Sequence, residues 1–411
     1  MRLPASGTEH PSGRPRVLVL TTTLPAKQGD GTPEFVLSLA LGLAEDFAIT
    51  ILAPAVPGAP AREVLQGVEI RRFRYVPRRW PGVADGAILD NLARHPSWLA
   101  QLPLLLGAML LATLRATARL HPQLIHAHWI VPAGLLAAPA RALRRVPLVL
   151  TVHGADVFGL RGRAYGWLRQ RVVRSADVVA PVSVDLATAL GIPEELHGDR
   201  VVPMGVDFAA VRAAVGTRQP APDRLLFVGR LVEKKGLDVL LRAIVQLPEA
   251  TLVVGGDGPQ RPKLQALAHE LGVADRVRFR GQLSKRAVVG ELRTAAAIVI
   301  PSRVARNGDR EGTPVVLAEA VAAEVPIIAS SVGGLAERIR PDVDGTLVAP
   351  GDVEALVVAL KAGLADPLRL AALARSARAH LADTLDMRHS TQCYGEFYRT
   401  LLAARRTTPS R

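Results

Sequence analysis

Two glutamates, Glu311 and Glu319 in the segment EGTPVVLAE, have the spacing that says most about chemistry. Glu311 precedes a predicted helix, and Glu319 lies about two turns further along, roughly 8–12 Å away at a rise of 1.5 Å per residue. Carboxylates at that distance cannot share one proton, so we expect them to hold different parts of an extended ligand. A capped helix with two solvated glutamates is the alternative that the spacing alone leaves open.

The start of the helix that carries Glu319 suits an anion. Thr313 is predicted to be the N-cap and Pro314 the first helical residue. Residues Gly312, Thr313, Pro314 and Val315 would then form a phosphate site through the free backbone N–H groups of this turn, to which Pro314 itself contributes none.

Two cations, Arg230 and Lys235, follow a predicted strand at residues 225–228. A guanidinium fork and an ammonium group can bind a pyrophosphate, and their charge stabilises a departing diphosphate. The neighbouring Lys234 is expected on the surface. Two solvated loop cations are the alternative.

Histidines follow two further predicted strands of the first half. His153 and Asp156, in HGAD, come after residues 148–151, where Asp156 is placed to orient His153 or an acceptor. His126 and His128, in HAHW, end the strand at residues 124–128 and are equally consistent with buried structural side chains. No further ligand lies at metal spacing from these two, so we predict no zinc site.

Glycines mark two loops where a backbone can approach a ligand closely. Gly258 belongs to the turn GGDGP at residues 255–259. Gly29 and Gly31 flank Asp30 in the loop after the first strand.

A basic stretch, RRFRYVPRRW, contains five arginines: Arg71, Arg72, Arg74, Arg78 and Arg79. With its interleaved aromatic residues it could hold anionic lipid headgroups or a polyprenyl-diphosphate acceptor, or single-stranded nucleic acid. A solvated basic strand pair is the plain alternative. The uncharged residues 98–114 follow, interrupted by a glutamine, a proline and a glycine, and we expect a buried or membrane-surface helix rather than a membrane span.

The elements that must position these residues alternate between short apolar strands and Ala/Leu-rich helices. This alternation predicts an α/β fold with two doubly wound, Rossmann-like domains facing an interdomain cleft. Ligands of open parallel sheets bind at the carboxyl ends of the strands, where the residues above are found. The predicted strands are residues 16–21, 48–52, 124–128, 148–151, 178–181, 225–228, 251–254, 276–279, 298–300 and 327–329.

Domain boundaries follow from composition. Residues 1–14 lack an apolar core segment and are predicted to be a disordered N-terminus, not a signal peptide. Residues 15–203 and 204–384 are predicted to form the two domains, with a Pro- and Gly-containing hinge at residues 202–207. Residues 385–411 are predicted to be a C-terminal helix that crosses back to the first domain.

Composition excludes several classes of protein. A chain of 411 residues with 49% hydrophobic residues is neither a disordered tail nor a small disulfide scaffold. Its single cysteine, Cys393, cannot form an intramolecular disulfide, so a cytoplasmic location is expected. The net charge of +14 is spread over both halves, which disfavours a nucleic-acid-binding tail.

Taken together, the motifs resemble the retaining glycosyltransferase family 4, the group 1 nucleotide-sugar glycosyltransferases with the GT-B fold. The resemblance rests on the Glu311–Glu319 pair and spans almost the whole chain. Six further motifs occur in the family's order: HGAD, VPMGVD, VGRLVEKKG, GGDGP, VGG and DGTLVAPGD.

The resemblance implies an N-terminal acceptor domain and a C-terminal nucleotide-sugar domain. It implies that Glu311 reaches hydroxyls of the donor sugar, that Glu319 binds the ribose, and that His153 lies near the outer hydroxyls of the sugar. The GGDGP turn would lie beside the nucleobase or ribose. No covalent nucleophile is implied, because members are usually described by front-face internal return, in which the departing phosphate takes the acceptor's proton.

The implied reaction is retaining transfer of a hexose from UDP or GDP, without a metal cofactor, to a lipid-linked or saccharide acceptor. Such an enzyme would serve cell-surface polysaccharide or glycolipid synthesis at the inner face of the membrane. No nucleic-acid partner is expected.

Two positions depart from the family's pattern. The loop sequence GDG at residues 29–31 replaces a pair of adjacent glycines, which weakens its phosphate role. Glu324 stands where a glycine is usual, at a helix C-terminus, and we expect lower stability there.

Two other functions remain open from the sequence. One is a non-hydrolysing nucleotide-sugar epimerase of the same fold. The other is a non-catalytic basic protein that binds membranes or nucleic acid.

Overall fold

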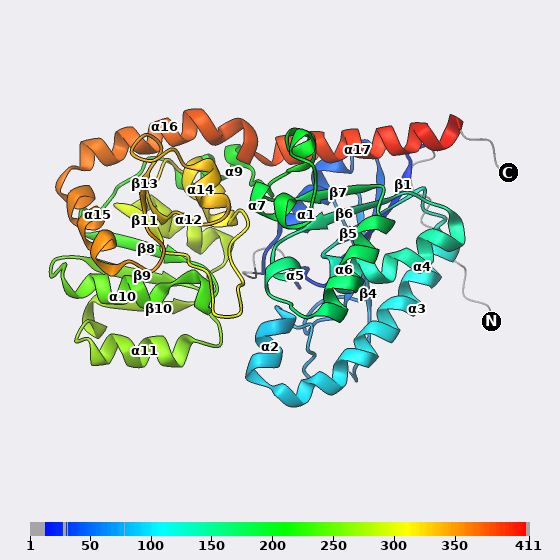
Figure 1. The fold of residues 1–411 in the computed structure, drawn as a ribbon, viewed down its shortest axis with the longest axis horizontal. Coiled ribbons are helices and arrows are strands. Elements are labelled where there is room, and N and C mark those ends of the chain that lie inside the picture. The colour runs from blue at the N-terminus through cyan, green and yellow to red at the C-terminus, as the bar shows by residue number, and fades with distance from the viewer. Residues whose placement is uncertain (1–12, 28–29, 31, 78, 408–411) are drawn as a thin grey trace.

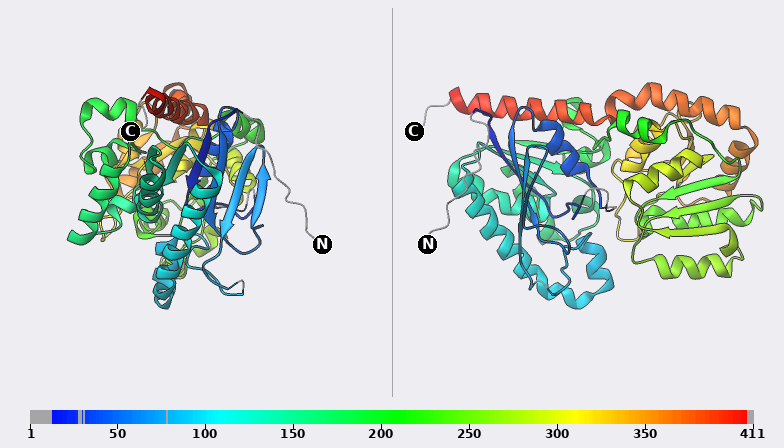
Figure 2. Two further views of the ribbon diagram at one scale, coloured as in Figure 1. Left: turned by 90° about the vertical axis from the view of Figure 1, so that its right-hand side faces the viewer. Right: turned by 180° about the vertical axis from the view of Figure 1, so that it is seen from behind.

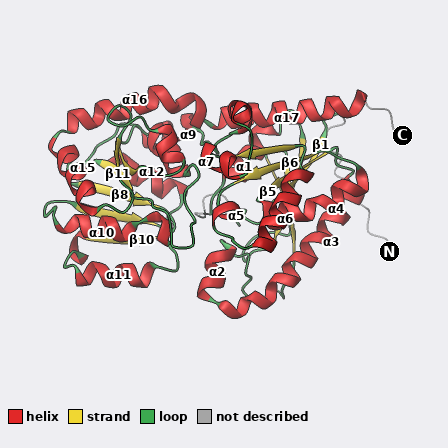
Figure 3. Cartoon of the chain, viewed as in Figure 1, coloured by secondary structure: helices red, strands yellow, loops and turns green. Residues whose placement is uncertain are grey.

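Two α/β units lie side by side, and a pair of long helices runs along one edge of both (Figure 1). The structure is a computed structural model, and it describes residues 13–27, 30, 32–77 and 79–407. In each unit the strands form an inner layer and helices cover both faces (Figure 3). The predicted 1–14 segment lies almost wholly outside the described residues.

The N-terminal sheet has seven strands in the order β3-β4-β2-β1-β5-β6-β7. All neighbours are parallel except the β3–β4 pair. The strands are β1 (Arg16–Leu20), β2 (Ala48–Pro54), β3 (Arg62–Leu65), β4 (Val68–Phe73), β5 (Leu124–His128), β6 (Leu148–Val152) and β7 (Val178–Pro181).

Helices of the N-terminal unit cover this sheet, and most of them connect its parallel strands. They are α1 (Phe35–Leu43), α2 (Ile88–Arg94), α3 (Leu102–Leu120), α4 (Leu135–Arg144), α5 (Ala155–Phe158), α6 (Arg163–Ser175), α7 (Val184–Ala189) and α8 (His197–Arg200). Three short turns, η1 (Pro96–Gln101), η2 (Ile130–Gly134) and η3 (Glu194–Leu196), lie between them.

The C-terminal sheet has six parallel strands in the order β10-β9-β8-β11-β12-β13. The strands are β8 (Arg224–Val228), β9 (Thr251–Gly255), β10 (Val277–Gly281), β11 (Ala297–Ile300), β12 (Ile327–Ser330) and β13 (Thr346–Val348). Its central strands are buried, which explains their nearly continuous apolar sequences.

The helices of the C-terminal unit follow the same alternation. They are α9 (Phe208–Val215), α10 (Leu237–Val245), α11 (Arg261–Glu270), α12 (Lys285–Thr294), α13 (Val315–Ala322), α14 (Gly334–Arg338), α15 (Val353–Ala365) and α16 (Pro367–Leu385). The turns η4 (Glu233–Lys235) and η5 (Ala274–Arg276) precede α10 and β10, and α17 (Met387–Thr407) ends the described chain.

All ten predicted strands are present, but the sequence prediction missed β3, β4 and β13. Charged residues interrupt the apolar runs of β3 and β4, which form an antiparallel edge hairpin through Gln66 and Gly67, both at positive φ. β13 has only three residues, too few for a periodic signal.

The uncharged residues 98–114 lie in η1 and α3, which confirms the prediction of a helix there. Within the described residues, Pro96–Leu120 is the one helix long and apolar enough to cross a membrane. One face of α3, with Leu105 and Met109, is fully buried in the N-terminal core, while Leu104 and Leu111 are exposed. In Figure 2, α2 and α3 project from the side of the N-terminal unit opposite α17.

The chain crosses between the two units twice at one place. Val206 pairs with Asp386, and Gly205 packs so closely that a Cβ there would lie 2.6 Å from the Leu385 carbonyl oxygen. Beyond this crossing, α17 packs on α1 and buries Tyr394 and Tyr398 in the N-terminal core.

Glu324, the departure from the family's glycine, has a φ of 52° at the end of α13. This is the left-handed conformation that glycine adopts at low cost. Its carboxylate accepts a hydrogen bond of 2.9 Å from Arg378, which offsets the unfavourable charge at the helix C-terminus.

Helix α17 is fixed to the N-terminal sheet by buried hydrogen bonds. The Tyr398 hydroxyl lies 2.6 Å from Nδ1 of His126, whose Nε2 lies 2.7 Å from the Thr151 hydroxyl. Thr151 in turn bonds the Tyr394 hydroxyl at 2.6 Å. All four side chains are fully buried.

We expect Tyr398→Phe to lower the free energy of unfolding by about 1–3 kcal/mol, because it leaves a buried nitrogen of His126 without its partner. Urea denaturation followed by tryptophan fluorescence measures this change. Leu368→Ala, at a position 84% exposed on α16, is the control and should unfold like wild type. Equal stability of Tyr398→Phe and wild type would contradict the structural role of this bond.

Candidate active site

The carboxyl ends of the two sheets meet where the loop after β6 contacts the loop before α13. A Cβ on Gly312 would lie 3.4 Å from the carbonyl oxygen of His153, and one on Gly154 would lie 3.8 Å from that of Arg310. These two loops carry His153 and Glu311, so the structure brings together site residues that are far apart in the sequence.

A buried ion pair joins two predicted site residues. Nζ of Lys235, at the end of η4, donates to Oε2 of Glu311 at 3.0 Å, and the two side chains are 13% and 7% exposed. The other carboxylate oxygen, Oε1, is buried and has no hydrogen-bond partner among the residues that the structure describes. An unpartnered buried carboxylate oxygen is costly, so it marks the place where a ligand hydroxyl can donate.

Electrostatics keep Glu311 ionised. Burial raises its pKa, but the charges of Lys235 and Lys234 outweigh burial, and the net shift of the pKa is downward. Burial also lowers the pKa of Lys235, and Glu311 opposes that shift.

Lys234 is not on the surface, contrary to the sequence prediction. Its side chain is 9% exposed, with Nζ 3.0 Å from Asp309 and 3.3 Å from the Arg310 carbonyl oxygen. Lys234 therefore anchors the loop that carries Glu311.

Helix α13 begins one residue later than predicted. Pro314 is its N-cap, no side chain caps it, and Val315 is its first residue. The prediction of Thr313 as N-cap was wrong, because its hydroxyl donates instead to the Val182 carbonyl oxygen of the N-terminal unit at 2.8 Å. Backbone N–H groups at the start of α13 still point toward the Glu311 end of the helix.

Glu319 lies within α13 and is half-buried. Burial raises its pKa to about 7; Lys285 lowers the pKa and Glu34 raises it. Lys285 lies 4.0 Å from Glu34, which precedes α1 in the N-terminal unit. Charged residues of both units therefore act on the carboxylate of Glu319.

Arg230 follows β8 as predicted, and its partner comes from the other unit. Nη1 of Arg230 donates to Oδ2 of Asp90 on α2 at 2.7 Å. One turn further along α2, Arg94 lies 3.6 Å from Asp257. A ligand phosphate at Arg230 must therefore compete with the carboxylate of Asp90.

His153 lies half-buried at the end of β6, beside a second histidine. Its Nε2 is 3.0 Å from Nδ1 of His128. Burial lowers the pKa of His153 and of His126 to about 3, and that of His128 well below its ordinary value, so all three are neutral at pH 7.

Asp156 does not orient the His153 side chain. Its carboxylate accepts hydrogen bonds from the backbone N–H groups of Ile130 and Gly154 at 2.8 and 3.0 Å. The role predicted for it through the imidazole is thus replaced by a structural one, fixing the two loops after β5 and β6.

The predicted glycines have varied surroundings. A Cβ on Gly258 would lie 2.4 Å from the Leu231 carbonyl oxygen, so close backbone packing alone requires a glycine there. Gly29 and Gly31 lie outside the described residues. Between them, Asp30 accepts backbone hydrogen bonds from Ala26 and Thr32, at 2.7 and 2.8 Å.

The basic stretch is not a continuous surface patch. The side chain of Arg72 is 1% exposed and donates to the Pro25 carbonyl oxygen, and Arg71 pairs with the buried Glu69 at 3.0 Å. Both lie on β4, which packs against its sheet. Of the others, Arg74 and Arg79 are exposed and Arg78 lies outside the described residues.

The sequence prediction missed Asp90 and the contacts that hold the two units together. Asp185 of α7 accepts two hydrogen bonds of 2.5 Å from Arg310, and Glu337 accepts from the backbone N–H groups of Val184 and Asp185. Asp185 and Asp90 are acidic residues in the first turns of α7 and α2. Those positions were the one feature of the sequence that could have pointed to them.

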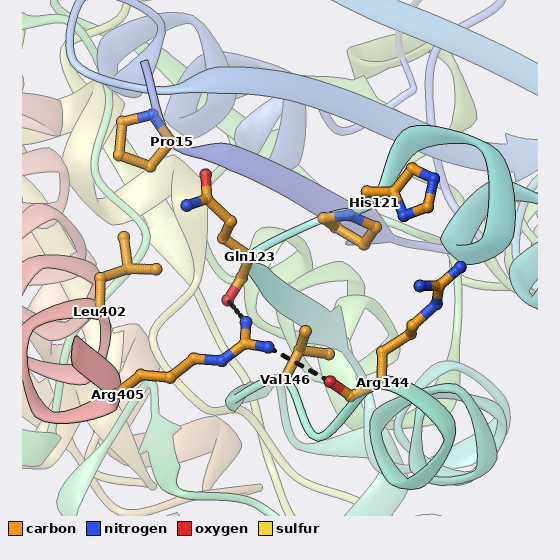
Figure 4. A pocket seen from close by; sticks show the side chains of 8 residues that line it. Pro15, His121, Gln123, Arg144, Val146, Leu402 and Arg405 are labelled. Atoms are coloured by element: carbon orange, nitrogen blue, oxygen red, sulfur yellow. Dashed lines mark hydrogen bonds between the residues drawn. The ribbon is translucent and has the colours of Figure 1, made fainter. Parts of the chain in front are cut away.

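A pocket of about 450 Å³ lies elsewhere, at the amino ends of the N-terminal strands (Figure 4). Arg405 of α17 crosses it and donates to the carbonyl oxygens of Gln123 and Arg144, at 3.5 and 3.3 Å. It is at the edge of the sheet opposite His153, so it is not part of the candidate site.

The fold, and the site residues at the junction of its two units, are those of a GT-B glycosyltransferase. Residues 30–205 match the family described as "Glycosyl transferase 4-like domain", and residues 214–380 match "Glycosyl transferases group 1". The chain belongs to the group 1 glycosyltransferases.

Similar proteins agree with this assignment. The chain is 34% identical to D-inositol 3-phosphate glycosyltransferase of Xylanimonas cellulosilytica over 89% of this chain and 92% of that protein. It is 31% identical to glycogen synthase of Mycobacterium tuberculosis over 69% and 70%. Among solved structures, sucrose-phosphate synthase of Thermosynechococcus elongatus superposes with a TM-score of 0.74, at 23% identity, over 95% of this chain and 100% of that chain.

We expect Glu319→Gln to change how stability depends on pH. The pKa of about 7 in the folded protein is above the ordinary value of 4.5, so the protonated form favours folding. The contribution is present below about pH 4.5 and is lost as the pH rises through 7. Melting temperatures from pH 5 to 8 should therefore fall more for wild type than for Glu319→Gln. Parallel curves for the two proteins would show that Glu319 is ionised throughout.

Proposed function

We propose that this glycosyltransferase transfers a hexose from a UDP- or GDP-sugar, with retained anomeric configuration, to a lipid-linked or saccharide acceptor. The buried Lys235–Glu311 pair carries the proposal, because Oε1 of Glu311, beside the loop of His153, has no partner in the described part of the chain. A sugar hydroxyl that donates to Oε1 satisfies this atom and fixes the donor between the two units.

The site residues divide the work on such a donor. Glu311 accepts from a hydroxyl of the sugar, and Glu319, deeper along α13, accepts from the ribose. Arg230, Lys235 and the start of α13 stabilise the diphosphate as it leaves. The bond from the anomeric carbon to the diphosphate oxygen breaks, the acceptor oxygen bonds to the same face, and its proton passes to the departing phosphate.

Relatives support the donor class. One, from Mycolicibacterium smegmatis, is named a GDP-mannose-dependent mannosyltransferase that acts on a phosphatidylinositol monomannoside, and it is 34% identical over 60% of this chain and 68% of that protein. Anabaena HepE, solved with UDP-glucose, superposes with a TM-score of 0.71 at 19% identity over 94% of this chain and 99% of that chain. These names motivate testing both nucleotides.

A thermal-shift screen of UDP- and GDP-sugars tests the proposal, because a ligand that binds the native state raises the melting temperature. The stabilising donor is then incubated with saccharide and polyprenyl-phosphate acceptors, and NMR of the product gives the anomeric configuration. Isomerised donor in the absence of acceptor would indicate an epimerase. Inverted product, or no transfer from any donor, would refute the proposal.

Substitutions that change the charge near the leaving diphosphate should have opposite effects, depending on whether they remove a cation or an anion. We expect Arg230→Ala and Lys235→Ala each to lower kcat/KM by about tenfold to a thousandfold, since charge-assisted contacts strengthen as the diphosphate departs. Asp90→Asn should instead tighten nucleotide binding, because it frees Arg230 from its 2.7 Å partner. Steady-state kinetics and calorimetry measure both effects. Wild-type turnover in both alanine variants would remove these cations from the mechanism.

We further propose that transfer needs no divalent metal. Lys235 and Arg230 supply positive charge at the carboxyl end of the C-terminal sheet, where a diphosphate would otherwise require a cation. The rate should therefore be unchanged in EDTA. Activity lost in EDTA and restored by manganese would contradict this.

We also propose that the enzyme is cytoplasmic and docks on the inner face of the membrane. The exposed face of η1 and α3 carries Leu99, Leu104 and Leu111, exposed by 60, 56 and 47%. Gln101 bonds to the loop that follows the basic stretch, through the Val83 N–H at 2.8 Å and the Pro81 carbonyl oxygen at 3.2 Å. The exposed apolar face of η1 and α3 supports this location, because apolar side chains of a surface helix can enter the headgroup region of a membrane.

Replacing Leu104 and Leu111 by glutamate should abolish sedimentation with vesicles that contain anionic lipid. Each charge removes apolar contact and adds repulsion from the headgroups. Leu368→Glu, at an exposed apolar position of the other unit, is the matched control. Wild-type protein that stays in the supernatant at both low and high salt would remove the membrane proposal.

A further inference from the structure

His128 is a buried histidine that contacts the candidate site through another side chain. It is the last residue of β5 and is 1% exposed. Strand β5 pairs with β6, which ends at Val152 directly before His153. The rings of His128 and His153 stack with centroids 5.3 Å apart, and Nδ1 of His128 is 3.0 Å from Nε2 of His153.

The surroundings of His153 leave one nitrogen for a ligand. Trp129 and Phe35 pack against the ring, with centroid distances of 4.6 and 4.9 Å. Nε2 is engaged by His128, and Nδ1 has no hydrogen bond within the described part of the chain. Trp129 itself has a φ of 71°, a strained conformation of the kind that occurs at functional sites.

The hydrogen bond between the two rings determines what Nδ1 can do. A neutral imidazole carries one N–H donor and one acceptor nitrogen, so fixing the role of Nε2 also fixes the role of Nδ1. Without a partner on Nε2, the ring can exchange between its two tautomers, and Nδ1 then alternates between donor and acceptor.

We propose that His128 is a positioning residue, which holds His153 in one tautomer and orientation so that Nδ1 meets a hydroxyl of the donor sugar or acceptor. This role rests on the proposed function, because it needs a hydroxyl-bearing ligand at His153. His126, two residues earlier on β5, has a different role, since both of its nitrogens bond residues that hold α17.

Three variants separate positioning from folding. His128→Phe keeps a planar ring but removes the hydrogen bond, and His128→Leu is the substitute if the phenylalanine does not fold. His128→Asn retains a polar group near the position of Nδ1. Thr151→Val is the matched control. Thr151 lies on the adjacent strand β6, and the change breaks its bonds to His126 and Tyr394 but leaves the 3.0 Å His128–His153 contact intact.

Two measurements are made on these proteins: long-range ¹H–¹⁵N NMR of the His153 ring and steady-state kinetics with the donor found by the screen. We expect a single His153 tautomer in wild type, His128→Asn and Thr151→Val, and a mixture in His128→Phe. We expect kcat to fall about tenfold to a hundredfold in His128→Phe with little change in KM, and to stay within about threefold of wild type in His128→Asn.

The same His153 tautomer in wild type and His128→Phe would overturn the proposal, as would an equal loss of kcat in Thr151→Val. Failure of the proposed function has a different signature. Wild type would then transfer no sugar at all, while the NMR spectra would still report whether His128 fixes the ring.

Discussion

The buried ion pair of Lys235 and Glu311 is the interaction on which the rest of the site depends. Removing two charges from water costs several kcal/mol for each, and only good geometry with further hydrogen bonds compensates. Here one contact of 3.0 Å is present, and no described residue donates to Oε1 of Glu311, so the described contacts compensate only part of this cost. Under the proposed function, a sugar hydroxyl that donates to Oε1 supplies the missing compensation.

The contacts between the two units keep this pair opposite His153. Thr313, next to the loop of Glu311, donates across to Val182, and Arg310 binds Asp185 with two hydrogen bonds. Within the C-terminal unit, Gly333 packs so closely on this loop that a Cβ there would lie 2.1 Å from the Glu311 carbonyl oxygen. Since all these contacts converge on residues 310–313, the position of Glu311 depends on both units at once.

Much of this arrangement follows from the sequence, because parallel strands place the residues after them at one edge of a sheet. That rule located His153 and Arg230, whereas Glu311 was found from its spacing to Glu319. The sequence also indicated Lys235 for the site, but it could not show that Lys234 is buried, since its partner Asp309 lies 75 positions away. Thr313 is not the N-cap of α13 because its hydroxyl bonds across to the other unit, a contact that local sequence does not show. Arg72 is buried because β4 pairs with β3, whereas an arginine is ordinarily expected on the surface.

The two cations of the site, Arg230 and Lys235, differ in how firmly each is held by its acidic partner. The three histidines are neutral, so positive charge toward a ligand comes from Arg230 and from Lys235, whose own charge is already balanced by Glu311. Arg230 is balanced only by Asp90, which belongs to the other unit and to α2, a helix without a buried residue. A diphosphate can take Arg230 from Asp90 at the cost of one partly exposed ion pair, worth about 0–1 kcal/mol. Displacing Glu311 from Lys235 would instead leave a buried charge unpaired, at about 3–5 kcal/mol. Under the proposed function, donor binding therefore loosens α2 and leaves the Lys235–Glu311 pair in place.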